Sequence, residues 1–272
     1  EPEIVSWPHL QQAHAWAEQA GVEAWPIHLK LDTGMRRLGI LPEEDAKAAA
    51  LLADSRLKLG TVMSHLAAGD DAEQDARTLD QLQAFANRVS SHFQGAQSHI
   101  LNTAGAARAQ AWLEGRPELG FLRDTIRIGL GMYGLAPHAT AHGLTPALAL
   151  TSVVSKLVDV PAGHGSGYGW TDAADHDRTL AVVSAGYADG YPRSLGGGQA
   201  HVGWNGHLLP TVGRVCMDMM TVDVTGLEVH PGDAVTLWGA APTLEVCAKQ
   251  AHTIPYELLT RIGPRVQRVS ER

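Results

Sequence analysis

Hydrophobic and polar positions follow two different patterns along the chain, and the pattern changes near residue 143. In the first part, short apolar runs alternate with segments whose apolar residues recur every three or four positions, as on one face of a helix. The clearest helical face, in segment 71–93, consists of Leu79, Leu82, Phe85, Val89 and Phe93. Alternation of strands and helices with short loops predicts parallel βα units.

The apolar runs of the first part predict four strands, at 27–31, 60–66, 98–101 and 125–132, and Glu3-Ile4-Val5 adds a fifth. A helix is predicted from Ser6, its N-cap, to Gln19, with Gly21 as its stop signal. A complete (β/α)₈ barrel has eight strands in about 250 residues. Residues 1–143 are therefore predicted to form the C-terminal part of a (β/α)₈ TIM-like barrel.

The second part of the chain, residues 144–272, is rich in β signals. Its β-rich stretches are 148–160, 179–187, 201–224 and 234–239. Asn205-Gly206 is a strong signal for a two-residue hairpin turn. One or two short helices are predicted within 243–262, and a closing strand over 266–269. This part is predicted to form a mostly antiparallel β domain.

Composition narrows the classes of function. The 272 residues are 44% hydrophobic and 18% charged, which is typical of a globular protein. The net charge of −8 opposes binding to a phosphate backbone, so no nucleic-acid partner is predicted. No apolar run approaches the ~18 residues of a membrane helix, and no signal peptide is recognised. Two cysteines and no metal-binding motif predict a cytoplasmic protein without a metal site.

The stretch "HLKLDTGMRRLG" (28–39) places polar residues directly after a predicted strand. In a βα barrel, groups just past the C-terminal end of a strand face the active site. Arg37 is therefore a candidate clamp for a carboxylate or phosphate, because its guanidinium forms a bidentate fork. An ordinary polar loop with surface arginines accounts for the stretch equally well.

Two further strand ends carry polar candidates. His65, in "VMSHLAAGDD" (62–71), is one, although a lone histidine is more often structural than catalytic. Asn102 and Thr103, in "HILNTAGAAR" (99–108), lie at a strand-to-helix junction. Amide N–H groups and hydroxyls at a helix N-terminus suit a phosphate. Plain N-capping is the commoner use of such residues.

Arg127 lies inside the apolar run of "DTIRIGLGMYGLAP" (124–137), where an arginine is costly unless it is paired. A functional role is therefore the leading interpretation for Arg127. Gly129 and Gly131 would let a ligand approach the backbone closely. The stretch "VGRVCMDMMTVDV" (212–224) is predicted to be a strand that bears Cys216, Met217 and Asp218, and core packing by its methionines is the plain alternative.

Together these features resemble bacterial alanine racemases, which are pyridoxal phosphate (PLP) enzymes of fold type III. The matching segments keep the family's order and cover almost the whole chain; they include "HLKLDTGMRRLG", "VMSHLAAGDD", "HILNTAG", "DTIRIGLGMYGL", "VPAGHGSGYG", "AGYADGYPR", "LPTVGRVCMDMMTVDV" and "TIPYELLTRIGPRV". Related PLP barrel proteins without the β domain lack "GYADGYPR" and "VGRVCMD". The resemblance implies an isomerase that interconverts L- and D-alanine and supplies D-alanine for peptidoglycan.

The resemblance also implies catalytic roles. Tyr187, in "GYADG", matches the family's catalytic tyrosine, one of two bases that act on opposite faces of the substrate. A free tyrosine has a pKa of about 10 and must be tuned to act as a base near neutrality. His65 matches the histidine beside that tyrosine, and Arg127 matches the arginine that the histidine touches. Arg127 also matches the arginine that faces the PLP pyridine nitrogen.

Further residues match the family's binding groups. Arg37 resembles the arginine that orients cofactor and substrate carboxylate, and Lys30 resembles a lysine that some members carry carbamylated. The residues that match the family's binding site for the PLP phosphate are Asn102, Thr103, Gly129 and Leu130. Met217 falls where a backbone group contacts the substrate, and Cys216 and Asp218 line the same place. In the family, Tyr187, Met217 and Asp218 act in the partner subunit's site, which implies a homodimer.

Several positions depart from the family pattern. Arg36 replaces a usual glycine, Thr103 replaces a usual serine and keeps the hydroxyl, and Pro264 lies where some members have a phosphate-binding tyrosine. The family's cofactor lysine, in a KANAYGHG-like motif, matches none of Lys30, Lys47, Lys58, Lys156 and Lys249. About three βα units of ~30 residues are expected to be missing, so ~90 to 100 N-terminal residues with the PLP lysine lie outside the sequence.

Two alternatives to an alanine racemase stay open at this point. The chain alone is expected to be inactive, and it could serve as a non-catalytic assembly or PLP-binding remnant. A racemase of serine or of another amino acid would show the same motifs, because the size of the substrate pocket depends partly on the segment that holds the lysine.

Overall fold

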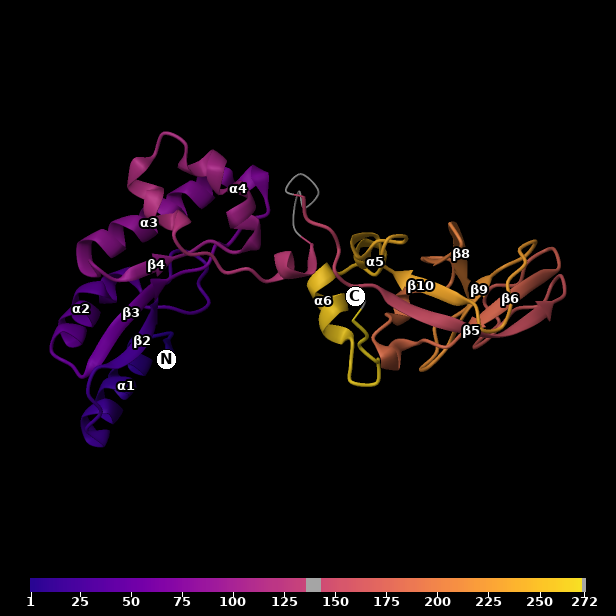
Figure 1. The fold of residues 1–272 in the computed structure, drawn as a ribbon, viewed down its shortest axis with the longest axis horizontal. Coiled ribbons are helices and arrows are strands. Elements are labelled where there is room, and N and C mark those ends of the chain that lie inside the picture. Colours follow the sequence, from indigo (N-terminus) through magenta and orange to yellow (C-terminus); the bar gives the residue numbers. More distant parts are fainter. Residues whose placement is uncertain (136–142, 271–272) are drawn as a thin grey trace. The chain divides into compact units, whose positions relative to one another are not determined.

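The computed structural model describes residues 1–135 and 143–270. The chain forms two compact units, Glu1–Thr145 and Pro146–Arg272. Figure 1 shows helices and strands alternating in the first unit and a β-rich second unit. The first unit is a parallel α/β part of the TIM-barrel type and the second an antiparallel β-barrel, as predicted from the sequence.

A four-stranded parallel sheet organises the first unit. Its strands are β1 (Glu3–Ile4), β2 (Trp25–Lys30), β3 (Leu57–Met63) and β4 (Gln97–His99), paired in that order. The helices are α1 (Trp7–Ala20), α2 (Asp45–Ala53), α3 (Asp75–His92) and α4 (Thr103–Leu113). Because the strands are parallel, the loops that follow β2, β3 and β4 leave from one edge of the sheet.

Local sequence signals fix the helices of this unit. The Ser6 hydroxyl accepts a hydrogen bond from His9 N at 3.3 Å, and Gly21 ends α1 in the left-handed conformation, as predicted. Helix α3 buries Leu82 and Phe85 on its predicted apolar face. Those side chains belong to a core that also contains Ile4, Leu10, Ile27, Leu29, Val62 and Ile100.

The strand predicted over 125–132 is wrong. Residues 124–129 have no regular structure, and a 3₁₀ helix, Leu130–Tyr133, follows them. Arg127 N donates to Leu101 O at 3.0 Å, but β4 has already ended at His99 and no ladder forms. Ile126 and Ile128 are exposed, so the alternating apolar side chains of this segment are not buried as they would be on one face of a sheet. A strand needs a hydrogen-bonded neighbour that this pattern alone does not supply.

The second unit is a closed antiparallel barrel. Its strands are β5 (Leu150–Val160), β6 (Arg178–Val183), β7 (His201–Trp204), β8 (His207–Val212), β9 (Met220–Asp223) and β10 (Ala234–Trp238). Around the barrel they follow the order β10-β5-β6-β9-β8-β7. Asn205 and Gly206 turn between β7 and β8 with φ of 45° and 79°, which confirms the predicted hairpin. Helices α5 (Leu244–Gln250) and α6 (Pro255–Arg261) follow the barrel.

Two strand predictions in this unit fail. Segment 212–224 is not one strand: β8 ends at Val212, a loop spans 213–219, and β9 begins at Met220. Gly213, with φ of 63°, turns the chain out of β8, and Cys216 N donates to Met219 O within the loop. Residues 266–269 form no strand either, because no neighbouring strand pairs with them in the described part of the unit.

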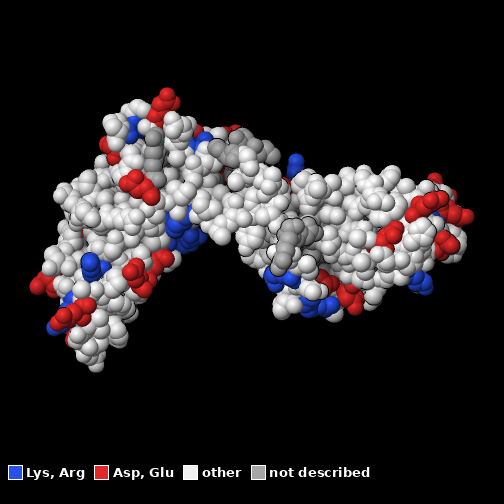
Figure 2. All heavy atoms as spheres, viewed as in Figure 1, with Lys and Arg blue, Asp and Glu red and all other residues white. Residues whose placement is uncertain are grey.

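Charge is unevenly distributed on the surface. Acidic side chains gather at the end of the second unit near β5 and β6, while uncharged side chains cover most of its visible face (Figure 2). Basic side chains on this face lie singly or in small groups among the described residues. They form no stripe of the kind that follows a nucleic-acid backbone.

Candidate active site

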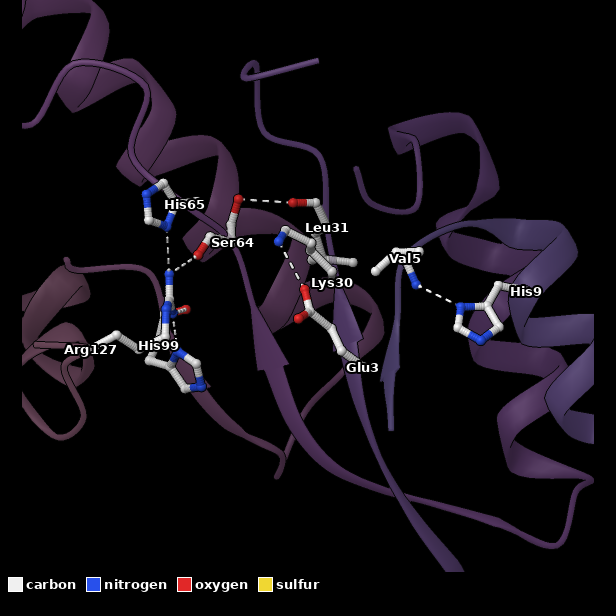
Figure 3. A network of polar contacts seen from close by, with 9 residues as sticks. All are labelled: Glu3, Val5, His9, Lys30, Leu31, Ser64, His65, His99 and Arg127. Carbon is white, nitrogen blue, oxygen red and sulfur yellow. Dashed lines mark hydrogen bonds and ion pairs between the residues drawn. The ribbon is translucent and has the colours of Figure 1, made fainter. Parts of the chain in front are cut away.

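The guanidinium of Arg127 joins the ends of two strands in the first unit. Arg127 Nη2 donates to Ser64 O at 2.5 Å and lies 3.1 Å from His65 Nδ1. Its Nη1 contacts Nδ1 of His99, the last residue of β4. Figure 3 shows the two imidazoles on either side of the guanidinium. The structure therefore brings together His65 and Arg127, which lie on separate stretches of the sequence.

Both imidazoles stay neutral near pH 7. Burial and the Arg127 charge lower the pKa of His99 to about 4. Burial lowers the pKa of His65 as well, and the charges of Arg127, Arg37 and Lys30 act in the same direction. Because a guanidinium can only donate hydrogen bonds, the Nδ1 atom of each ring accepts and the ring proton lies on Nε2. His65 thus keeps an N–H donor on the side away from Arg127.

His99 is a site residue that the sequence patterns did not single out. It is only 8% exposed and ends β4, just as His65 follows the end of β3. The sequence prediction placed His99 inside the strand 98–101, so the signal of a polar residue at a strand end did not point to it. In the structure β4 ends at His99, the position that faces the site in such folds.

Thr103 and two glycines form a small polar cradle at the start of α4. The Thr103 hydroxyl accepts hydrogen bonds from Gly129 N at 3.0 Å and from Gly131 N at 3.4 Å. A Cβ on Gly131 would lie 2.9 Å from Thr103 Cγ2, so only glycine allows this approach. Leu130, between the glycines, is buried. While it accepts these two hydrogen bonds, the hydroxyl keeps its own proton as a donor, and a hydroxyl donor at a helix N-terminus suits a phosphate.

Of the two roles predicted for Asn102, phosphate binding and N-capping, this structure shows the N-capping. It is the N-cap of α4, and its Oδ1 accepts a hydrogen bond from Gly105 N at 2.9 Å. Because Asn102 caps α4, Thr103 is the first residue of the helix, and its hydroxyl there contacts Gly129 N.

Arg37 lies on the loop that follows β2, here called the Arg37 loop (residues 32–40). Asp32 Oδ1 accepts from Gly34 N at 2.8 Å and from Arg36 N at 3.0 Å, which holds the loop in a turn. Arg36 has φ of 54°, the left-handed conformation that favours glycine. Arg37 itself is exposed.

Lys30 comes from the end of β2, just before the Arg37 loop. Its Nζ lies 2.8 Å from Glu3 Oε1 (Figure 3). The Lys30 side chain is 12% exposed and that of Glu3 40% exposed. The ion pair ties the ends of β1 and β2 together beside the site.

Tyr187 belongs to the second unit and sits on a loop fixed by its backbone. Tyr187 N donates to Cys216 O at 3.0 Å, and Ala188 N donates to Met217 O at 2.8 Å. A Cβ on Gly186 would lie 2.4 Å from Cys216 O, so this close approach requires glycine. Two side chains of this loop pair are exposed at the surface, Tyr187 at 44% and Met217 at 57%. Tyr187, Cys216, Met217 and Asp218 are thus neighbours on two joined loops.

The second tyrosine of "GYADGY" has a different environment from the first. Tyr191 is fully buried and stacks on Trp238 with ring centroids 6.1 Å apart. Asp189, between the two tyrosines, accepts from Gly186 N at 3.0 Å and pairs with Arg265 Nε at 3.3 Å. The motif therefore anchors the loop through Tyr191 and Asp189 and leaves Tyr187 accessible.

The described part of the chain contains no group of three or more His, Cys, Asp or Glu side chains that could hold a metal ion. None of its described helices is both long and apolar enough to cross a membrane.

Family models match both units. Residues 4–137 match the alanine racemase N-terminal domain, and residues 147–270 match the alanine racemase C-terminal domain. The alanine racemase 3 of Salmonella typhi is 33% identical over 270 residues, which are 99% of this chain and 68% of that protein. An alanine racemase of Shewanella sp. is 39% identical over 248 residues, which are 88% of this chain and 65% of that protein.

A solved structure gives the same relationship. The alanine racemase of Bartonella henselae with covalently bound pyridoxal phosphate superposes with a TM-score of 0.86 at 31% identity, covering 98% of this chain and 72% of that one. The chain thus spans about two thirds of the length of the relatives it matches. With matches to both domain models in family order, this chain belongs to the alanine racemase family.

Proposed function

We propose that the protein containing this chain is a PLP-dependent alanine racemase that interconverts L- and D-alanine. The observation that carries the proposal is the Arg127 guanidinium held between two neutral imidazoles, His65 and His99, at the strand ends. Alanine as the substrate is supported by the names of the relatives. No feature of the described residues favours serine or a larger amino acid over alanine.

The residues present fit PLP in two places. Thr103 and the amides beside it would hold the phosphate, and Arg127 would face the pyridine nitrogen. When bound, PLP supplies an electron-withdrawing ring that acidifies the substrate Cα–H. Arg127 can only donate and holds no proton-accepting group, so it would leave the pyridine nitrogen unprotonated. Electron withdrawal would then be weaker, which would favour return of the proton to Cα, as a racemase requires.

Tyr187 would act as one base and exchange the Cα proton on its face of the substrate. A tyrosine needs donors and positive charge nearby to work near neutrality. The Nε2–H of His65, backed by Arg127, is the donor that we assign to it. We place Tyr187, Met217 and Asp218 of one subunit in the partner subunit's site, which makes the enzyme a homodimer.

The second base would be the lysine that carries PLP. None of the five lysines of this chain matches the family's cofactor lysine, so we assign that role to a lysine outside these 272 residues. Arg37 would orient the substrate carboxylate. Lys30 would serve beside Arg37, either as the ammonium that pairs with Glu3 or, with that ion pair broken, as an anionic carbamate. We further infer a cytoplasmic enzyme that supplies D-alanine for peptidoglycan; the free thiols of Cys216 and Cys247 support a reducing compartment.

The decisive experiment measures racemisation by the full protein. L-Alanine and D-alanine are incubated separately in D₂O with PLP and protein, the enantiomers are separated by chiral chromatography, and their masses are measured. Both incubations are expected to reach the same equal mixture, with one solvent deuteron gained at Cα. Retention of pure L-alanine by PLP-loaded protein would contradict the proposal.

The lysine assignment has its own test. The 272-residue chain is treated with PLP and borohydride, which makes any lysine–PLP bond permanent, and its mass is measured. No stable adduct is expected. An adduct that disappears in Lys30→Arg would show that this chain carries its own cofactor lysine.

A further inference from the structure

Helix α3 approaches the candidate site through one buried glutamine. Gln81 is 7% exposed and lies between the Arg37 loop and the His65 loop, the latter defined as residues 64–69 after β3. A buried glutamine amide is costly unless its donors and acceptor are used. Its partners therefore show what the side chain does.

Gln81 binds both loops at once. Its Nε2 donates to Thr33 Oγ1 at 2.9 Å and to His65 O at 2.8 Å. Its Oε1 accepts from Ala67 N at 3.1 Å. Both N–H donors of the amide are thus committed, one to each loop, and the backbone on both sides of Leu66 is held.

Beyond Gln81, hydrogen bonds continue through Thr33 and Ser64, and each hydroxyl donates to the next acceptor in the series. Ser64 Oγ donates to Leu31 O at 2.8 Å, so its single proton is used there. Thr33 Oγ1, 2.7 Å away, must then donate to Ser64 Oγ while it accepts from Gln81. Such a chain strengthens each of its members by mutual polarisation.

This series of hydrogen bonds ends at Ser64, whose backbone carbonyl also binds Arg127. Ser64 O accepts from Arg127 Nη2, and His65, the next residue, accepts from the same nitrogen. Gln81 therefore fixes the Arg37 loop and the His65 loop relative to the guanidinium without touching Arg127. We propose that Gln81 is a positioning residue that sets His65 and the Arg37 loop for the reaction; its catalytic consequence depends on the proposed racemase function.

The test uses Gln81→Glu in the full protein. Glutamate has the same shape and keeps the acceptor for Ala67 N, but it loses both donors and places a carboxylate against His65 O. Gln81→Met is a second variant without charge, in case the glutamate variant folds poorly. Gln83→Glu is the matched control, because Gln83 lies on the same helix and bonds Asn87 Oδ1 at 3.0 Å, away from both loops.

The first measurement is hydrogen–deuterium exchange, which needs neither cofactor nor turnover. Amides of residues 32–40 and 64–69 are expected to exchange roughly tenfold faster in Gln81→Glu and Gln81→Met, and as in wild type in Gln83→Glu. Thr33→Val should open the same two segments, since it removes the linking hydroxyl, while Thr33→Ser keeps it. Unchanged exchange in both Gln81 variants would overturn the proposal.

The second measurement is turnover. The Gln81 variants and Thr33→Val are expected to lose about 10- to 100-fold in kcat/KM, whereas Thr33→Ser and Gln83→Glu keep it. Equal losses in Gln81→Glu and Gln83→Glu would overturn the positioning role. If wild-type protein does not racemise alanine but the exchange pattern is as expected, the proposed function fails and the structural role of Gln81 stands.

Discussion

Nη2 of Arg127 lies 3.1 Å from Nδ1 of His65, and the direction of that contact decides the chemistry of the site. A guanidinium offers only donors, so the imidazole must be neutral and accept at Nδ1. The proton on Nε2 then points away from Arg127, where a phenol or phenolate can use it. In the proposed function, this N–H is the donor that we assign to Tyr187.

The Tyr187 hydroxyl is expected to be required for racemisation. Tyr187→Phe removes the proton acceptor and leaves the loop intact, because the loop is held by backbone bonds to Cys216 and Met217. Turnover by the full protein should fall about 10²- to 10⁴-fold, the usual range for loss of an acid–base group. Chiral chromatography of product measures it. Tyr168→Phe, at an exposed tyrosine of the same unit, is the control and should retain activity.

Gly186→Ala tests whether the Tyr187 loop must lie close to the backbone of Cys216 and Met217. The added Cβ would lie 2.4 Å from Cys216 O, so the joined loops must separate. Racemisation should fall at least ~10-fold, with a Tm loss of several degrees, since overpacking costs about 1–3 kcal/mol. Gly263→Ala meets no atom within 4 Å and should behave as wild type. Equal behaviour of the two variants would show that the approach is not required.

A buried ion pair clamps the Arg37 loop at both ends. Arg88 forms two hydrogen bonds with the Asp45 carboxylate, at 2.6 and 2.7 Å. It also donates to Asp32 O at 2.5 Å and to Ile40 O at 2.8 Å, the first and last residues of the loop. Arg88 is 8% exposed and Asp45 2%, so removing one partner leaves the other charge buried.

Arg88→Met is therefore expected to destabilise the first unit by roughly 3–5 kcal/mol, measured by urea unfolding. The freed loop should also be cut faster by trypsin after Arg36 or Arg37, by roughly tenfold, as seen by mass spectrometry. Adding Asp45→Asn to Arg88→Met should recover part of the stability, because the unpaired carboxylate is removed. Arg77→Met, at an exposed position of α3, is the control. Wild-type cleavage rates in Arg88→Met would contradict the clamp.

His99 predicts a dependence of stability on pH. Burial and the Arg127 charge lower its pKa to about 4 in the folded protein, while the unfolded chain has the ordinary value near 6.5. His28 adds to this effect and Glu3 opposes it. Between pH 6.5 and about 4 the unfolded state binds the extra proton, so stability falls as pH falls through this window.

The expected loss from His99 is on the order of 2–3 kcal/mol across that window, with no further loss below the folded pKa. Denaturant unfolding at several pH values measures it. His99→Asn cannot titrate and should flatten the dependence by that amount. His92→Asn, at an exposed position of α3, should leave it unchanged. A slope in His99→Asn equal to that of wild type would show that folding does not lower the pKa of His99.

Short-range signals in the sequence determine much of the fold. Ser6 and Gly21 bound the first helix, Asn205-Gly206 closes a hairpin, and the apolar face of α3 packs as its spacing indicates. Each signal acts over a few residues, so it operates wherever the chain carries it. The failed strands at 125–132 and 266–269 depend instead on a neighbouring strand, and no local pattern provides one.

The site divides in the same way. The sequence patterns singled out Arg127, His65 and Thr103, because each breaks a local rule: a charge in an apolar run, or a polar group at a strand or helix end. The role of Tyr187 followed only from the resemblance to the family. Only the tertiary structure showed that His99 and Gln81 belong with Arg127 and His65. His99 lies 28 residues from Arg127 along the chain, and Gln81 lies 48 from Thr33. Parallel strands that end at one edge bring such residues within hydrogen-bond distance, and that depends on the packing of the whole unit.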